Sequence, residues 1–205
     1  PAGLWQVATL AAGLTLTRYE GMFAVAAMVV ALSVVGRWRA GTVVAVAGAV
    51  PVVMYGLWSQ SQGGFLLPNS VLLKGVAPAM TAAGLLKLVL FWPAITGLMA
   101  NPHLAFLLIA VLGLVAMRRR DRHARQHEVL ALVFAASTML HLQFARVGWF
   151  FRYEAYLVVF GLVTVAALAR DIEWPAVPRA GNRVVAVTAV VLLAIVLTFP
   201  LLRRG

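Results

Sequence analysis

Long apolar stretches alternate with short polar ones along the whole chain. A transmembrane helix needs about 20 mostly apolar residues, within a range of about 17–25. Seven stretches are apolar enough to form the cores of such helices, with ends that extend into flanking residues. They are Leu4–Leu16, Met22–Val35, Thr42–Trp58, Pro102–Met117, Val129–His141, Ala155–Ala169 and Val184–Leu202. Because they lack the strict alternation of barrel strands, they predict an all-α, polytopic transmembrane helix bundle with about seven spans.

An eighth apolar stretch, Pro78–Ala100, carries Lys87 and Pro93 and does not fit as a full span. Arginine-rich loops gather on the cytoplasmic side of a membrane. The three basic gaps can share that side only if Pro78–Ala100 does not cross. The gaps are Arg37–Arg39, Arg118–Arg125 and Arg170–Arg183. We therefore expect Pro78–Ala100 to be an interfacial or re-entrant segment.

The next helix is expected to begin at Asn101 and Pro102, with the asparagine as its N-cap and the proline in its first turn. The same topology places three segments on the outward side of the membrane. These segments are Thr17–Gly21, Ser59–Ala100 and Gln143–Tyr153.

Composition agrees with the hydrophobic pattern. Hydrophobic residues make up 63% of the 205 positions and charged residues only 11%, against about 45–50% and about 25% in soluble domains. These values exclude a water-soluble globular protein and a disordered chain. The absence of cysteine excludes disulfides and thiolate metal sites. The chain starts at Pro1 inside an apolar stretch, so residues 1–205 are interpreted as one transmembrane domain of a longer membrane protein.

The net charge of +11 would suggest nucleic acid as a partner of a soluble protein. Here the charges are confined to the gaps between apolar stretches, so they are interpreted as a signal of topology. Membrane lipid is therefore an expected partner, and nucleic acid is not.

The first outward polar cluster contains Arg18 and Glu20 between two predicted spans. Charged residues at membrane depth are costly and are a functional hypothesis by default. The structural alternative is a tight turn between two helices, closed by an Arg–Glu pair.

The second cluster runs from Gln60 to Gly75. Asn69 or Ser70 could cap a short helix that presents Lys74, a point charge suited to phosphate. The alternative is an interfacial lysine that extends to lipid headgroups.

The third cluster, Arg146–Glu154, has two arginines, at positions 146 and 152, among four aromatic residues. It could hold a phosphate or a sugar ring, or it could be an aromatic belt with arginines at the headgroups. His103 and His141 are interpreted as structural.

Three phrases in this order resemble motifs of bacterial C-type (GT-C) membrane glycosyltransferases. Thr17-Arg18-Tyr19-Glu20-Gly21 is similar to their T-R-P-E-G element. Leu67-Pro68-Asn69-Ser70 followed by Lys74 is similar to L-P-N-T-x-x-x-K, and Arg152-Tyr153 to their R-Y element. The resemblance is greatest to actinobacterial arabinofuranosyltransferases and mannosyltransferase-like proteins, and it covers roughly residues 17–168. Tyr19 departs from the family proline, and Ser70 from its threonine.

The resemblance implies transfer of a sugar from a polyprenyl-phosphate donor to an acceptor hydroxyl on a glycan, a lipid-linked sugar or a protein. Cations would neutralise the departing phosphate, and Lys74, Arg152 and Arg18 are assigned this role. Glu20 would orient a sugar hydroxyl or hold Arg18, while Asn69 and Tyr153 would help to bind the substrate. Such enzymes carry a catalytic Asp in their first outer loop. No matching loop is present, so the general base is expected upstream of residue 1.

The resemblance implies that the chain lies in a bacterial plasma membrane with its active face outward. The sequence demands no cofactor, and a divalent cation is an open option. Two other functions fit the same residues: a transporter or flippase of polar lipids or glycolipids, and a membrane subunit without a catalytic site.

Overall fold

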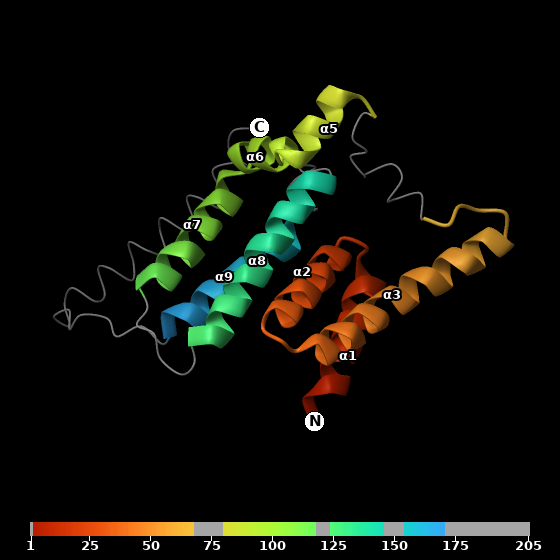
Figure 1. The fold of residues 1–205 in the computed structure, drawn as a ribbon, viewed down its shortest axis with the longest axis horizontal. Helices are drawn as coiled ribbons and strands as arrows, with labels where there is room; N and C mark the ends of the chain where they lie inside the picture. The colour runs from red at the N-terminus through yellow and green to blue at the C-terminus, as the bar shows by residue number, and fades with distance from the viewer. Residues whose placement is uncertain (1, 68–79, 118–123, 146–153, 171–205) are drawn as a thin grey trace. The chain divides into compact units, whose positions relative to one another are not determined.

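In the computed structural model, residues 2–67, 80–117, 124–145 and 154–170 are described (Figure 1). Their regular elements are all α-helices, which confirms the all-α part of the predicted fold class for these residues. The helices are α1 (Ala2–Thr17), α2 (Gly21–Val34), α3 (Trp38–Ser61), α5 (Ala82–Val89), α6 (Trp92–Ala100), α7 (Pro102–Met117), α8 (Ala124–Phe144) and α9 (Ala155–Arg170).

Six of the seven predicted stretches coincide with helices to within a few residues, and the seventh, Val184–Leu202, lies outside the described residues. Two helices of the described part are long and apolar enough to cross a membrane, namely α3 and the Gln126–Phe144 part of α8. The bent pair α5 and α6 makes a third if it counts as one span. Helices α2, α7 and α9 are apolar but shorter. The chain therefore has the character of a membrane protein, and the number of seven spans stays a prediction.

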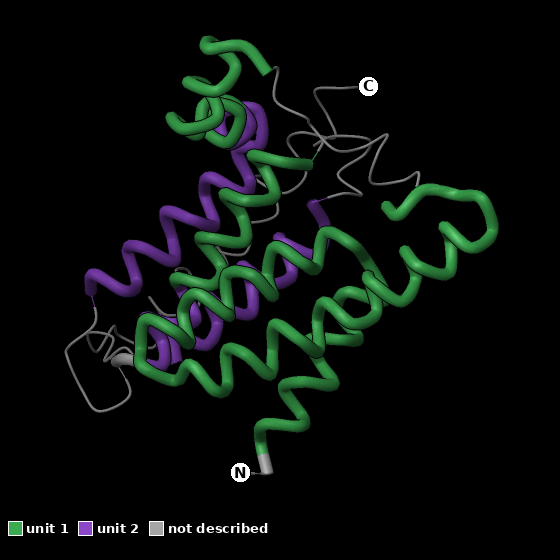
Figure 2. The backbone as a smooth tube through the Cα atoms, turned by 45° about the vertical axis from the view of Figure 1, so that its right-hand side comes forward, with its two compact units in different colours: residues 1–96, 132–147 green, residues 97–131, 148–205 purple. Residues whose placement is uncertain are grey.

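The chain divides into two compact units (Figure 2). Unit 1 contains Pro1–Thr96 and Leu132–Val147, and unit 2 contains Gly97–Ala131 and Gly148–Gly205. The prediction of a single transmembrane domain for residues 1–205 stays a prediction.

Helices α1, α2 and α3 form one side of unit 1, and α3 packs against both of the others. A small apolar core of Ala11, Val25 and Val44 lies between them. The helices approach closely because small residues face the contacts. Gly48 of α3 is such a residue, since a Cβ atom there would lie 2.7 Å from the Cγ1 of Val25 on α2. Small residues at contacts are typical of membrane helices, which gain more from close packing than from hiding apolar surface.

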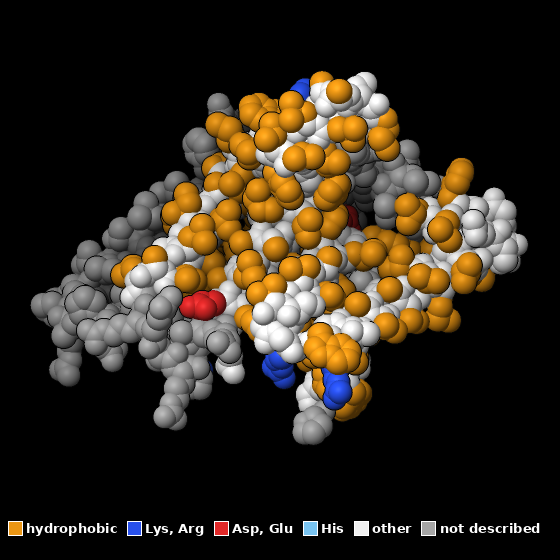
Figure 3. Space-filling model, viewed as in Figure 1, with side chains coloured by type: hydrophobic (Ala, Val, Ile, Leu, Met, Phe, Trp, Pro, Cys, Tyr) orange, Lys and Arg blue, Asp and Glu red, His pale blue; other side chains and the backbone are white. Residues whose placement is uncertain are grey.

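Aromatic residues mark both ends of α3. At its start, the guanidinium of Arg39 lies 5.3 Å from the ring centroid of Trp38. Near its end, the rings of Tyr55 and Trp58 lie 5.9 Å apart. The helical rise places Trp38 and Trp58 about 30 Å apart, which is about the thickness of the hydrocarbon core. Figure 3 shows a face on which most described side chains are hydrophobic and few are charged, as contact with lipid requires.

A sharp break separates α5 from α6, whose axes differ by 63°. The backbone turns at Phe91, which adopts the left-handed φ of 53° that is uncommon for a residue with a side chain. At the other end of α5, the hydroxyl of Thr81 accepts a hydrogen bond from the Gly84 N–H, 3.1 Å away, and caps the helix. The break is compatible with the predicted interfacial or re-entrant segment and also with a broken span.

Gln143 of α8 joins the two sides of this break. Its side-chain Nε2 donates to the carbonyl of Leu88, 3.0 Å away, and its Oε1 accepts from the N–H of Ala94, 3.2 Å away. The Ala94 N–H lies in the first turn of α6, where no partner exists within the helix. Gln143 and Ala94 are both buried, so one amide side chain satisfies backbone groups on both helices.

In unit 2, α7 packs against α9. The buried residues recur every three or four positions, as one helix face requires. They are His103, Leu104, Leu107 and Val111 on α7 and Leu157, Gly161, Thr164 and Leu168 on α9.

The predicted start of α7 is correct at Pro102, its first residue, and wrong in the role of Asn101. The Asn101 Nδ2 donates to the Gly97 carbonyl in the last turns of α6, 2.8 Å away. Its Oδ1 accepts no hydrogen bond from the described residues. The side chain therefore reaches back to the preceding helix, since a carbonyl there offers a partner within reach, and does not cap α7.

We expect Gly48→Ala to lower the stability of the helix bundle by about 1–3 kcal/mol, because the added methyl overlaps the stiff side chain of Val25. The thermal midpoint of the purified protein in detergent measures the effect. Gly13→Ala is the matched control, since its Cβ would meet nothing within 4 Å and alanine is the better helix former. Equal midpoints for the two variants would contradict the close contact of α2 with α3.

We expect Gln143→Ala to cost about 1–3 kcal/mol, since it removes two hydrogen bonds and leaves a buried N–H without its partner. Thermal unfolding is the measurement, with Gln60→Ala at the exposed end of α3 as the control. A midpoint for Gln143→Ala as high as that of Gln60→Ala would show that the bridge does not hold the break.

Candidate functional site

The predicted Arg18–Glu20 cluster lies in the three-residue turn between α1 and α2. The turn is held by its own backbone: the N–H of Arg18 donates to Leu14, that of Gly21 to Arg18, and that of Met22 to Tyr19, over 2.9–3.2 Å. The hydroxyl of Thr17 adds a bond to the Leu14 carbonyl at 3.0 Å. The backbone and the Thr17 hydroxyl thus make the turn without any of these bonds coming from the side chains of residues 18–20.

Gly21 gives this turn its tightness. A Cβ atom at Gly21 would lie 2.6 Å from the Leu14 carbonyl oxygen and 2.8 Å from the Leu14 Cγ. Among described glycines, positive φ occurs only at positions 36 and 63, so Gly21 is needed for space and not for its conformation. The glycine of the T-R-x-E-G phrase thus lets the start of α2 rest against the end of α1.

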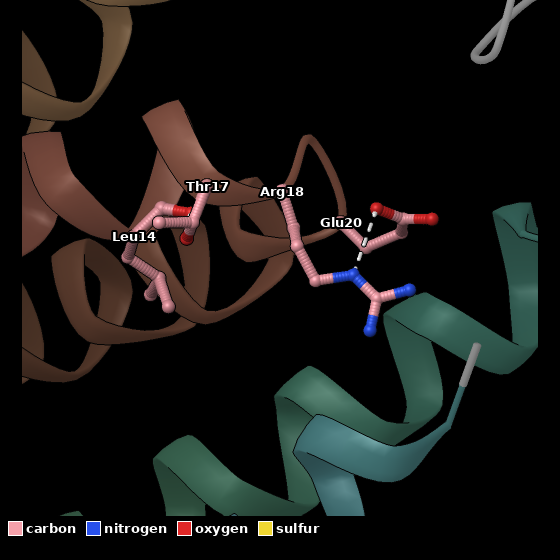
Figure 4. A network of polar contacts seen from close by, with 4 residues as sticks. All are labelled: Leu14, Thr17, Arg18 and Glu20. Atoms are coloured by element: carbon pink, nitrogen blue, oxygen red, sulfur yellow. Dashed lines mark hydrogen bonds and ion pairs between the residues drawn. The ribbon is translucent and has the colours of Figure 1, made fainter. Parts of the chain in front are cut away.

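Arg18 and Glu20 are brought together by the turn. The Nε of Arg18 lies 3.8 Å from the Oε2 of Glu20, and the side chains are 33% and 20% exposed (Figure 4). A tight hydrogen bond between such groups is about 2.7–2.9 Å long, so the pair is a looser electrostatic contact. Arg18 follows the C-terminus of α1 and Glu20 precedes the N-terminus of α2. Each charge therefore has the sign that the nearby helix dipole stabilises. This pair is the outcome that the structural alternative predicts, and it leaves a functional role open.

Aromatic rings flank the turn on the α3 side. Tyr19 meets Tyr55 edge to face, with centroids 6.3 Å apart, and Tyr55 in turn contacts Trp58. Partial burial raises the pKa of the Tyr19 phenol above its ordinary value of 10, and Tyr55 adds to the rise. Tyr19 therefore keeps its proton at neutral pH and can donate a hydrogen bond.

His141, which is interpreted from the sequence as structural, lies at the same end of unit 1. It is fully buried near the end of α8, and its ring stands edge-on to Phe23, with centroids 5.9 Å apart. The charges of Glu20 and Arg18 both act on it. Phe144, three residues further along α8, stacks on Phe23 at 6.5 Å. The spacing of His141 and Phe144, three apart at a helix end, is the sequence signal that marks them as one face.

These contacts bring parts of all three predicted outward segments of unit 1 to the same end of its helices. The α1–α2 turn meets α3 through Tyr19 and Tyr55, and the first turn of α2 meets α8 through Phe23 and Phe144. The end of α8 holds the α5–α6 break through Gln143. The shared location follows from contacts within unit 1 alone.

Comparison with known proteins leaves the family open. No family model, curated protein or solved structure matches the chain. The resemblance to C-type glycosyltransferases therefore depends only on the three short phrases.

Four of the six predicted substrate-binding residues lie outside the described residues: Asn69, Lys74, Arg152 and Tyr153. Arg146 lies outside them as well. Their convergence with Arg18 on one cavity stays a prediction. Glu154, the last residue of the third cluster, is described. It is buried at the start of α9, where its carbonyl accepts from the N–H groups of Leu157 and Val158.

The described residues contain no group of three or more His, Asp or Glu side chains that could hold a metal ion. Within this part of the chain, the chemistry of the candidate site thus comes from one guanidinium, one carboxylate, one buried imidazole and the phenols beside them.

We expect Gly21→Ala to lower stability by about 1–3 kcal/mol, because the new methyl meets a backbone oxygen that no side-chain rotation can move away. Thermal unfolding in detergent measures the change. Gly113→Ala in α7 is the control, since a Cβ there meets nothing within 4 Å. If Gly21→Ala and Gly113→Ala unfold at the same temperature, the close approach of α2 to Leu14 is wrong.

Proposed function

We propose that this chain is part of a membrane glycosyltransferase that moves a sugar from a polyprenyl-phosphate donor to an acceptor hydroxyl at the outer face of a bacterial plasma membrane. The acceptor would be a glycan, a lipid-linked sugar or a protein. The observation that carries the proposal is the Arg18–Glu20 pair, which lies in a tight turn at the end of apolar helices. The T-R-x-E-G phrase that forms this turn is the phrase that resembles the glycosyltransferase family.

The chemistry of the reaction explains why a cation is needed there. When the sugar leaves, negative charge develops on a lipid phosphate, and a fixed positive group stabilises that charge. Arg18 suits this role because it is one-third exposed and its contact with Glu20 is long. A phosphate could therefore reach the exposed part of the guanidinium and receive hydrogen bonds from it. The resemblance assigns the same role to Lys74 and Arg152, and assigns substrate binding to Asn69 and Tyr153.

Glu20 has two roles that the reaction allows. It could hold the Arg18 side chain in place, or it could accept a hydrogen bond from a sugar hydroxyl. Tyr19, which stays protonated, adds a neutral donor beside the pair. Such a group of donors and acceptors at the end of apolar helices suits a substrate with a polar head and a lipid tail, such as a polyprenyl-phosphate sugar.

We expect Arg18→Gln to weaken the binding of a radiolabelled polyprenyl-phosphate sugar by the protein in lipid nanodiscs about 10-fold or more, since a bond to a charged group contributes about 1.5–3 kcal/mol. Arg39→Gln is the matched control, because this exposed arginine lies beside Trp38 at the start of α3. Lys74→Ala and Arg152→Ala should weaken binding in the same way.

Equal binding by the Arg18→Gln and Arg39→Gln variants would remove Arg18 from the donor site. The products separate the reaction classes. The full-length glycosyltransferase, which would include the general base expected upstream of residue 1, releases free polyprenyl phosphate together with a lengthened acceptor when acceptor is present. A flippase moves the labelled lipid to the other leaflet and leaves the sugar attached, and that result would overturn the proposal.

A further inference from the structure

The α5–α6 break lies at the level of one end of α8. The Gln126–Phe144 part of α8 has 19 residues, which span about 28 Å and so almost match a hydrocarbon core of about 30 Å. Gln143 is the last residue but one of this helix, and its side chain holds both Leu88 and Ala94. If α8 crosses the membrane, the break therefore lies at the membrane surface.

The location of the break distinguishes a broken transmembrane span from a segment that lies at the membrane surface. A transmembrane helix that is broken in its middle has its break near the midplane, about 15 Å from either surface. The break in this chain is at the surface instead. Helix α5 has eight residues and is about 12 Å long, which is too short to cross the membrane from that point.

The side chains of α5 are arranged for a boundary between apolar and polar surroundings. None of its residues is buried, and Leu85, Leu86 and Val89 are 47%, 58% and 74% exposed. At 100° per residue these three side chains lie within one third of the helix circumference. Lys87, exposed in the last turn, points to the opposite side. A short helix with an apolar face and a lysine on the other face is typical of one that lies in the membrane interface.

We propose that α5 is an interfacial helix that lies along the membrane surface at the end of α8. Leu85, Leu86 and Val89 contact the upper part of the acyl chains, and Lys87 binds the phosphates of anionic phospholipids. The occupant of this exposed face is the bilayer, because a positive charge opposite an apolar face matches an anionic headgroup above acyl chains. The proposal depends on the membrane location of α8 and is independent of sugar transfer.

The depth of α5 can be measured directly, since the chain contains no cysteine. Single cysteines at Leu86→Cys and Val89→Cys are spin-labelled in nanodiscs, and collisions with oxygen and with a water-soluble nickel complex report depth. Val50→Cys, an exposed position near the middle of α3, is the deep control, and Gln62→Cys, just after α3, is the aqueous control. Circular dichroism and gel filtration confirm that each variant is folded.

We expect both α5 labels to lie about 5–10 Å below the headgroup boundary, clearly shallower than the label at position 50. Labels as deep as the Val50→Cys label would show that α5 is part of a broken span. Labels as accessible to nickel as the Gln62→Cys label would show that α5 does not contact lipid. Either result overturns the proposal.

A second comparison tests Lys87. The label at position 89 is measured in nanodiscs of phosphatidylcholine and in nanodiscs with added phosphatidylglycerol. The anionic lipid should draw the label toward the membrane, Lys87→Gln should abolish this shift, and Lys87→Arg should retain it. No shift with Lys87 present, or the same shift in Lys87→Gln, would overturn the contact with phosphate.

Discussion

A membrane leaves no water for the backbone, and this constraint shapes the described part of the chain. Every N–H and C=O group in hydrocarbon needs a partner within the protein, and helical hydrogen bonding provides most of these partners in α3, where Pro51 has no N–H to donate. Helical bonding stops at the α5–α6 break, where the two helix axes differ by 63° at Phe91. The Ala94 N–H there is shielded from water by the protein itself, since Ala94 is fully buried. Gln143 of α8 supplies the acceptor for the Ala94 N–H and a second donor for the Leu88 carbonyl, which also accepts from the Phe91 N–H. A polar residue in an apolar sequence is therefore placed where the backbone demands it.

Much of this arrangement can be predicted from the sequence, since a long apolar stretch indicates a helix in a membrane. Pro102 marks the start of α7 as expected, and the unusual content of Pro78–Ala100 indicates a segment that differs from its neighbours. The partner of Gln143 could not be predicted, because glutamine carries no signal of which distant backbone it will reach. Asn101 shows the same limit: it has the composition of an N-cap, and a carbonyl of the preceding helix is its actual partner.

The candidate site shows a similar division. That Arg18 and Glu20 would meet follows from their spacing in a short turn. The position of that turn beside Tyr55 and His141 depends on contacts between segments that are far apart in the sequence. Local spacing thus predicts the charged pair, and only the packing of α3 and α8 gives the pair its aromatic surroundings. The buried His141 brings an ionisable ring close to Arg18 and Glu20. The electrostatic interactions at this end of unit 1 therefore involve three side chains.

The backbone of the α1–α2 turn also bears on the tolerance of the chain to sequence change. The described residues offer no hydrogen-bond acceptor to the N–H of Tyr19, while the N–H groups of Arg18, Gly21 and Met22 all have one. Proline, which has no N–H to donate, would therefore lose no hydrogen bond at position 19. The tyrosine that departs from the T-R-P-E-G phrase and the proline of that phrase are thus interchangeable in backbone hydrogen bonding. The exchange would remove the tyrosine ring that contacts Tyr55. Variation at this one position can therefore change the aromatic contacts beside Arg18 and Glu20 without a loss of backbone hydrogen bonds in the turn.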